Sequence, residues 1–343
     1  MKIKLTKQEK NWILYDVGNS AFTLLAATIL PIYFNYIAGK QGLSDVQYLA
    51  YWGYAVSIAT LLTALAGPVF GTVADTKGYK KPVFTIALGI GAIASVALGF
   101  AKYWLAFLVV FVIAKVGYSV TLVFYDSMLV DVTLEDRMDE VSSQGYAWGY
   151  IGSCVPFVIC LLVVLNAGKI GITMEIAMMV SFVIITVWWV IMTLPLLKTY
   201  HQKYYVEKKQ HAFSESFKRI GITLKNVKKE KKVFLFLLAF FFYIDGVYTI
   251  IDMATAYGSA LGLSSTGLLL ALLLTQIVAF PFAIIFGRLA KKYSAEKLIT
   301  VCIVAYLGVA IFAIFLHYQW QFWVLAVWVG MFQGGVQALS RSY

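Results

Sequence analysis

Nine polar side chains lie inside segments of this chain that are otherwise apolar enough to sit in lipid. They are Asp16, Asn19, Lys115, Asp126, Asp245, Asp252, Gln333, Gln337 and Arg341. A charged side chain at the centre of a bilayer costs roughly 3 kcal/mol even on a lenient insertion scale, so such residues persist where they face a wet cavity or a partner. Carboxylates, amides and a lysine can bind a polar solute there, and a desolvated carboxylate can take up a proton.

The spacing of these residues puts neighbours on shared helix faces. Asp16 and Asn19 are three residues apart, and Lys115 and Asp126 are eleven apart, which is close to three helical turns. Two hypotheses fit this pattern. The residues either line a path for a solute or a proton, or they form structural ion pairs that brace helices against one another.

Composition places these residues in a polytopic membrane protein. Of the 343 residues, 61% are hydrophobic and 13% are charged, and the mean hydropathy is +0.80, unlike a soluble domain. The apolar runs are too long and unbroken for the alternating strands of a membrane barrel. They predict an all-α fold whose membrane spans lie at 12–38, 48–74, 82–101, 104–130, 144–165, 172–196, 233–258, 264–288, 298–317 and 321–340.

The lysines and arginines predict the orientation. They concentrate in the N-terminal segment, in alternate loops and in the central loop, so the N-terminus and the central loop are expected in the cytoplasm. The net charge of +11 is therefore divided by side of the membrane and predicts no nucleic-acid partner. On this topology Lys115 and Asp245 fall near the midplane, whereas Asp16, Asp126 and Arg341 fall toward the cytoplasm. Asp252, the second aspartate of the seventh span, falls toward the outside.

The central loop also divides the chain into two units. A six-span unit at 1–197 is followed by a linker at 198–232 and a second unit at 233–343. Apolar residues recur at helical spacing in the linker, from Phe213 to Val227, with lysines between them. This pattern predicts a basic amphipathic helix on the inner leaflet. We favour the simpler interpretation, a tether that joins the two units and needs no specific ligand, because such helices commonly bind only the headgroup surface of membrane lipids.

A loop motif occurs at corresponding places in the two units. The sequence reads GTVADTKGYKK after the second span and GRLAKKYSAEK after the eighth. The first copy resembles the loop signature of the major facilitator superfamily of transporters, in which this loop is a conformational latch, and the second copy is degenerate. We expect Gly71 to allow a close helix approach, Asp75 to accept hydrogen bonds from a neighbouring helix, and Gly78 to allow a tight turn. Lys80 and Lys81 are expected to hold the loop at the cytoplasmic surface.

The resemblance implies that spans 1, 4, 7 and 10 line a central cavity. Eight of the nine polar residues fall on those spans, and Arg341 follows at the inner end of the tenth. WILYDVGNSAF, FFYIDGVYTII and GMFQGGVQALSRSY resemble the branch that contains autophagy-related vacuolar amino-acid effluxers and their bacterial relatives. Two further helices follow in that branch, so we expect a chain truncated before them, with an incomplete four-helix second bundle. In the fifth span, the spacing of Gly145, Gly149 and Gly152 indicates helix packing.

The sequence therefore predicts a secondary active transporter that moves a small polar solute across the membrane by alternating access. The resemblance makes amino acids the best candidates and leaves efflux and proton coupling open. The compact chain and its short loops suit a bacterial cytoplasmic membrane. A transport-inactive sensor or scaffold of the same fold is the alternative. A membrane-embedded enzyme is disfavoured because the sequence shows no nucleophile–base pair, metal-ligand cluster or nucleotide-binding loop, so neither a metal nor a cofactor is expected.

Overall fold

The computed structural model describes residues 4–207, 226 and 229–343. Within these residues the regular structure is helical apart from one isolated bridge between Thr76 and Val206. In this described part of the chain, ten segments are long and apolar enough to cross a membrane, which confirms the predicted all-α membrane fold. They are α1 (Lys7–Ala27) with α2 (Ile29–Lys40), α3 (Asp45–Ala74), α4 (Lys80–Ala97) with η1 (Leu98–Phe100), α5 (Trp104–Ser127), α7 (Met138–Leu165), α8 (Met174–Thr199), α10 (Lys231–Ala260), α11 (Ser265–Leu289), α12 (Ala295–Ile314) and α13 (Gln319–Ser342).

Two short helices, α6 (Leu129–Val132) and η2 (Glu135–Arg137), connect α5 to α7. The apolar residues of the amphipathic helix expected in the linker, from Phe213 to Val227, lie outside the described residues. The division of the chain at the linker stays a prediction.

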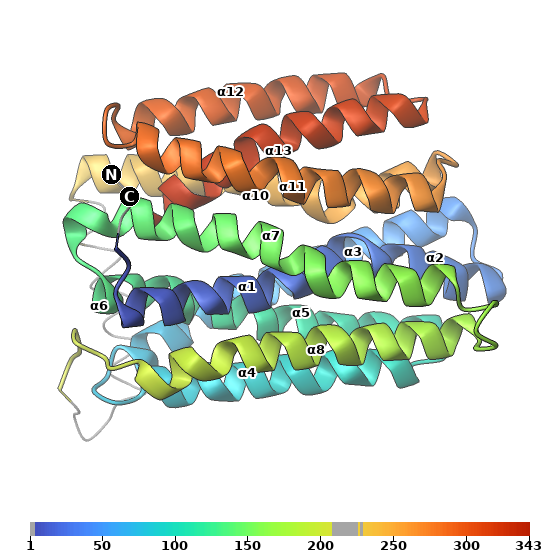
Figure 1. Cartoon of the computed structure of the whole chain (residues 1–343), viewed down its shortest axis with the longest axis horizontal. Helices are drawn as coiled ribbons and strands as arrows, with labels where there is room; N and C mark the ends of the chain where they lie inside the picture. The colour runs from blue at the N-terminus through green and yellow to red at the C-terminus, as the bar shows by residue number, and fades with distance from the viewer. Residues whose placement is uncertain (1–3, 208–225, 227–228) are drawn as a thin grey trace.

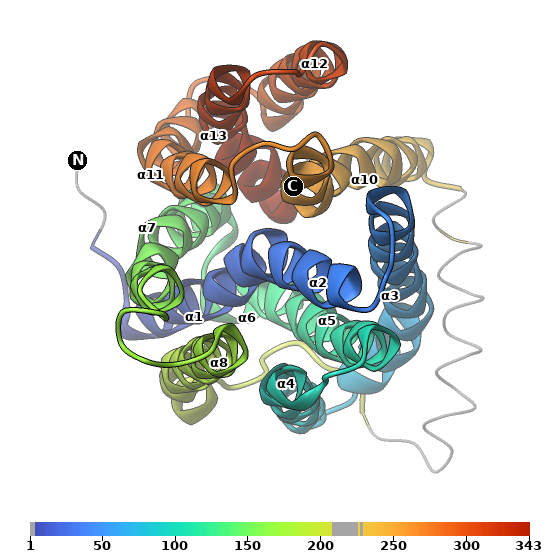
Figure 2. The same cartoon turned by 90° about the vertical axis from the view of Figure 1, so that its right-hand side faces the viewer.

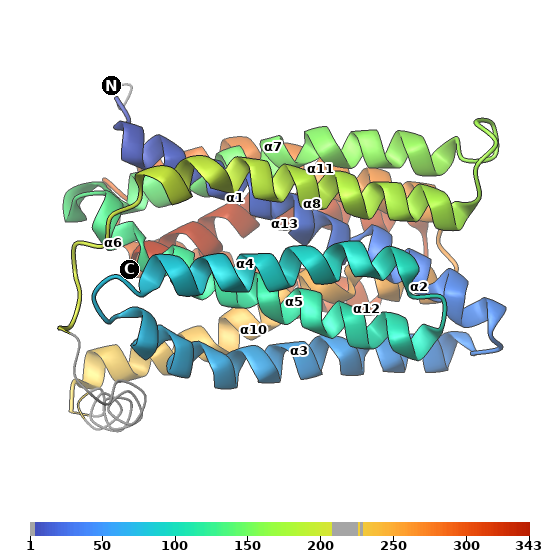
Figure 3. The ribbon, with the colours of Figure 1, turned by 90° about the horizontal axis from the view of Figure 1, so that it is seen from below.

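The long helices run side by side along the long axis and alternate in direction (Figure 1, Figure 3). We call the end where α1 begins the proximal end. The α3–α4 loop and the ends of α8 and α13 lie there too, and the opposite end is the distal end. Seen end-on, α11, α12 and α13 lie on one side and α4, α5 and α8 on the other, with α1, α2 and α7 between them (Figure 2). Helices far apart in the sequence, such as α7 and α11, therefore pack together.

The first membrane segment is interrupted in its middle. Thr6 and Glu9 form a capping box that begins α1. Thr28, with φ −121° and ψ −76°, breaks the helix between α1 and α2. A break frees backbone carbonyls, and that of Ala27 accepts a hydrogen bond from the Thr255 hydroxyl of α10 at 2.5 Å. The break therefore ties the first segment to the seventh.

Two hydrophobic cores hold the bundle together. One is built mainly from side chains between Trp12 and Tyr200, and the other from side chains between Val247 and Leu339. A small third cluster joins α7 to α11. Many large apolar side chains remain exposed along the outside of the helices, as expected for a surface that faces lipid.

Glycines of α7 let that helix lie directly against α1. A Cβ at Gly149 would come within 2.6 Å of the Ser20 hydroxyl oxygen, and one at Gly152 within 2.6 Å of a Val17 methyl group. A larger residue at either position would push the two helices apart. The packing role predicted for these glycines is confirmed.

Candidate functional site

Arg341, near the end of α13, is the buried centre of a polar cluster at the proximal end. Its Nη1 donates to Asp16 Oδ2 of α1 at 3.0 Å and lies 3.6 Å from Asp126 Oδ1 of α5. Its Nε and Nη2 donate to the hydroxyl and the carbonyl of Ser142 in α7, at 2.8 and 2.7 Å. The arginine side chain is only 3% exposed, so these partners replace the water that its charge would otherwise require. We call these four residues the proximal cluster.

Three aromatic rings surround the same guanidinium group. Its central carbon lies 4.0 Å from the ring centroid of Tyr146, 4.6 Å from that of Trp12 and 5.5 Å from that of Tyr125. The last two rings stack on each other with centroids 4.4 Å apart. A planar guanidinium stacks on aromatic faces and forms several directed hydrogen bonds, which an ammonium group does less well. The position therefore specifies arginine rather than any cation.

A series of hydrogen bonds leads from the proximal cluster toward the middle of the bundle. Asn19 donates to Asp16 Oδ1 at 3.2 Å and accepts from the Tyr118 hydroxyl at 3.3 Å. Tyr118 also shares a hydrogen bond of 2.5 Å with Thr23. Asp16 and Asn19 are both buried, and they interact on the helix face that their spacing predicts.

Lys115 and Asp252 form a second ion pair, which we call the distal pair. The lysine ammonium lies 2.9 and 3.0 Å from the two carboxylate oxygens, and the two side chains are 12% and 10% exposed. The pair joins the middle of α5 to the distal half of α10. Nearby, the Asp252 carbonyl accepts from Trp52 of α3 at 3.4 Å, and Asn35 of α2 donates to Ser259 at 3.0 Å. Helices from both parts of the chain are therefore in contact in the distal half.

Asp245 and the two glutamines of α13 are placed differently from the paired residues. Asp245 is exposed on α10, and its carboxylate has no hydrogen-bond or ion-pair partner among the described residues. Gln337 accepts a hydrogen bond from the Tyr150 hydroxyl at 2.6 Å. Gln333 is 5% exposed, and its side chain has no described hydrogen-bond partner. Asp245 and Gln333 are thus the members of the predicted path whose side chains have no hydrogen-bond or ion-pair partner within the described part of the chain.

Residues 71–81, which we call the latch loop after their predicted role, differ from expectation at two positions. Gly78 has φ of +77°, which turns the chain between α3 and α4 and favours glycine, and Lys81 is exposed as expected. The expectation for Gly71 was wrong, because a Cβ there would meet no described atom within 4 Å. The expectation for Lys80 was also wrong. That side chain is buried, and its ammonium lies 3.4 Å from Asp131, because the first turn of α4 points it inward.

Asp131 and the segment that follows α8 hold this loop in place, and the sequence pattern indicated neither. We call residues 200–207 the strap. Asp131 accepts hydrogen bonds from the Tyr200 hydroxyl at 2.5 Å and from the backbone N–H groups of Lys203 and Tyr204 at 2.9 and 3.0 Å. Burial, and then the hydrogen bond to this carboxylate, raise the pKa of Tyr200, so the hydroxyl remains a neutral donor.

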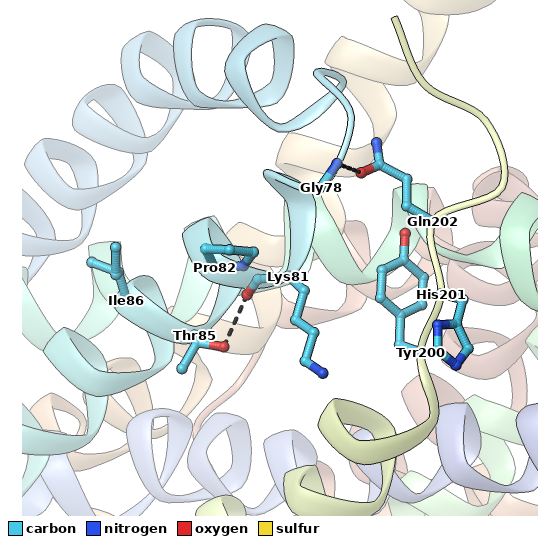
Figure 4. Close-up of a pocket in the computed structure, with 8 residues that line it drawn as sticks. All are labelled: Gly78, Lys81, Pro82, Thr85, Ile86, Tyr200, His201 and Gln202. Carbon is cyan, nitrogen blue, oxygen red and sulfur yellow. Dashed lines mark hydrogen bonds between the residues drawn. The ribbon is translucent and has the colours of Figure 1, made fainter. Parts of the chain in front are cut away.

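The strap also bonds directly to the latch loop. The Val206 N–H donates to the Asp75 carbonyl at 2.8 Å, and the Val206 carbonyl accepts from the backbone N–H of Lys77 at 3.0 Å. The Gln202 amide oxygen accepts from the Gly78 N–H at 3.1 Å (Figure 4). The first residues of the linker thus hold the loop that the motif identified.

Comparison with known proteins also indicates a transporter. The family described as vacuole effluxer Atg22 like matches residues 6–343. The chain is 44% identical to the uncharacterized MFS-type transporter YxiO of Bacillus subtilis, over 100% of this chain and 81% of that protein. It is 23% identical to Autophagy-related protein 22 of Vanderwaltozyma polyspora, over 99% of this chain and 79% of that protein. These descriptions name transporters and effluxers and indicate no enzyme family.

Solved transporter structures share the fold. The inward-open structure of the xylose transporter XylE from E. coli covers 97% of this chain and 86% of its own, with a TM-score of 0.66 at 12% identity. A structure of the nucleoside transporter NupG covers 97% of this chain and 80% of its own, with a TM-score of 0.61 at 16% identity. Identities this low establish the fold alone, which is that of the major facilitator superfamily.

Proposed function

This chain belongs to the Atg22-like family of major facilitator transporters, and we propose that it moves a small polar solute, with amino acids as the best candidates, across the membrane by alternating access. We place it in a bacterial cytoplasmic membrane with the proximal end inside. The Bacillus relative supports the membrane, and the concentration of lysines in the loops at that end supports the orientation.

One observation carries the proposal: buried ion pairs at two depths join helices that precede the linker to helices that follow it. The proximal cluster joins α13 to α1 and α5, and the distal pair joins α5 to α10. Access from one side requires the contacts at that end to separate while the other end stays closed. Buried ion pairs suit this exchange, because their desolvation cost offsets much of their attraction and they can open to water at a small net cost. The two separate hydrophobic cores support rigid units that rock about these contacts.

The distal pair suits a solute that carries both a carboxylate and an ammonium group. A solute carboxylate would bind Lys115 while its ammonium binds Asp252, so that a zwitterion replaces both partners and leaves neither charge unpaired. The free amide of Gln333 adds a neutral donor and acceptor on α13. This complementarity and the effluxer description of the family support amino acids over uncharged solutes.

Asp245 is the residue we assign to proton coupling. It lies on α10, two helical turns before Asp252, and no described cation pairs with it. Carboxylates inside membrane segments commonly form proton relays in transporters. A carboxylate without a fixed cationic partner can gain and lose a proton as access alternates.

Uptake of labelled amino acids into proteoliposomes that hold the full chain tests the proposal. Uptake should exceed that of empty liposomes and should increase with an imposed pH gradient. Asp245→Asn should remove the dependence on the gradient. Asp136→Asn should keep it, because that variant makes the same charge change at an exposed site in η2, in the connection between α5 and α7. Absence of uptake by correctly folded wild-type protein would remove the amino-acid assignment, and absence for every polar solute tried would favour a sensor or scaffold.

A further inference from the structure

A surface pocket lies at the proximal end between the latch loop, the first turns of α4 and the strap. Its volume is about 660 Å³, and its lining includes Lys81, Pro82, Ile86 and His201. The residues of the loop and of α4 form one side of the pocket, and the strap residues form the other (Figure 4). The pocket is therefore shared by two segments that are distant in the sequence and that the latch holds together.

Two donor side chains of this pocket are unpaired. Lys81 and His201 are both exposed, and neither side chain has an ion pair or hydrogen bond to another described residue. Nearby carboxylates already have partners: Asp131 pairs with Lys80, and Glu207 lies 3.2 Å from the Lys77 ammonium. The pocket thus presents two nitrogen donors that make no described ion pair or hydrogen bond, which suits an anionic ligand.

The remaining wall of the pocket is apolar and leads into the membrane. Pro82 and Ile86 lie in the first two turns of α4, the helix that begins the membrane segment Lys80–Phe100, and Ile86 is 63% exposed. An anion that carries acyl chains would place its charge between Lys81 and His201 and its chains along this wall. A free inorganic anion would leave the apolar wall uncovered.

We propose that this pocket binds the phosphate of an anionic phospholipid in the leaflet at the proximal end, with Lys81 Nζ and a ring nitrogen of His201 as donors. Lys81 belongs to α4, and His201 belongs to the strap. One bound lipid would therefore bridge the two segments and stabilise the strap against the latch loop. This binding site is independent of which solute the protein carries.

Native mass spectrometry of the full chain in detergent, titrated with phosphatidylglycerol, measures binding of the first lipid. The Lys81→Gln/His201→Gln variant should bind it about tenfold more weakly, and each single variant should lose part of that affinity, because each substitution removes one of the two nitrogen donors to the phosphate. Lys10→Gln, which removes another exposed lysine at the proximal end, should bind like the wild type. Phosphatidylcholine should bind all of these proteins weakly and equally.

Three results would overturn the inference. Unchanged phosphatidylglycerol binding by the double variant and by both single variants would show that the pocket is not the site. An equal loss in Lys10→Gln would show diffuse charge attraction rather than a site. Displacement of the lipid by inorganic phosphate at equal affinity would show that a free anion is the ligand. The melting temperature is measured without lipid. If the double variant melts like the wild type, weaker binding is not caused by unfolding. If the double variant unfolds, the two single variants decide the test.

Discussion

Gly145 of α7 lies so close to Asp16 of α1 that a Cβ on the glycine would overlap the carboxylate oxygen Oδ2. The same Cβ would come within 2.9 Å of Arg341 Nη2 and within 3.1 Å of the Trp12 ring. Because Gly145 has no side chain, α7 leaves room for the ion pair between α1 and α13. The glycine spacing that predicts helix packing also serves the polar site.

Gly145→Ala should destabilise the protein by about 1–3 kcal/mol, because the added methyl group overfills a packed site and displaces a buried ion pair. Thermal unfolding of the purified protein in detergent measures the effect as a lower melting temperature. Gly89→Ala is the matched control, because it lies inside α4 and a Cβ there would meet no described atom within 4 Å. Equal melting temperatures for the two variants would contradict the packing seen at Gly145.

Removal of one charged partner of the distal pair should lower the free energy of unfolding more than removal of both. Lys115→Gln or Asp252→Asn leaves a mostly buried charge without its partner, which costs about 3–5 kcal/mol when burial is complete, whereas the double variant leaves no charge. Unfolding of the wild type, the two single variants and the double variant gives the coupling between the side chains. Additive losses would show that the two residues do not form a pair in solution.

Arg341→Lys should open the proximal end despite keeping the charge. Lysine loses the fork that reaches Asp16 and Ser142 together, and hydrogen bonds to charged groups contribute about 1.5–3 kcal/mol. A cysteine at Gln333, two helical turns deeper in α13, should then react about tenfold faster or more with a membrane-impermeant maleimide added at the proximal side. Arg288→Lys, at an exposed position of α11, should not change that rate. No acceleration in Arg341→Lys would mean that the proximal cluster does not close this end.

Asp131→Asn should loosen the strap. The backbone N–H groups of Lys203 and Tyr204 lose a charged acceptor, so exchange of their amide hydrogens should speed up by about tenfold. Asp136→Asn, at an exposed position of the same connection, should leave the exchange unchanged. Exchange that stays slow in Asp131→Asn would show that other contacts hold the strap.

Hydropathy and length predict the membrane segments well, because a lipid-spanning helix requires a long apolar run whatever it packs against. The partners of buried charges depend on helix rotation and depth, which a single sequence does not record. Two aspartates on α10, seven residues apart, are equivalent in pattern. The structure pairs Asp252 with Lys115 and leaves Asp245 unpaired among the described residues.

The latch loop also shows that a single sequence does not record helix rotation, here for two adjacent residues. Lys80 and Lys81 are adjacent and identical, yet one helical step turns the first to Asp131 and the second to the surface. Asp131 itself follows the fourth span with no motif around it. Its importance comes from the strap, which reaches it from the other end of the six-span unit.

Pulsed electron paramagnetic resonance on the full chain in lipid nanodiscs tests alternating access most directly. Spin labels at Glu140 of α7 and Lys291 in the turn after α11, whose side chains form an ion pair, report on the proximal end. Labels at Asn35 and Ser259 report on the distal end. The three buried native cysteines are first replaced by alanine. Arg341→Ala should lengthen the proximal distance while the distal distance stays the same or shortens, and Lys115→Gln should do the reverse. Two distances that lengthen together, or that respond to neither variant, would contradict alternating access.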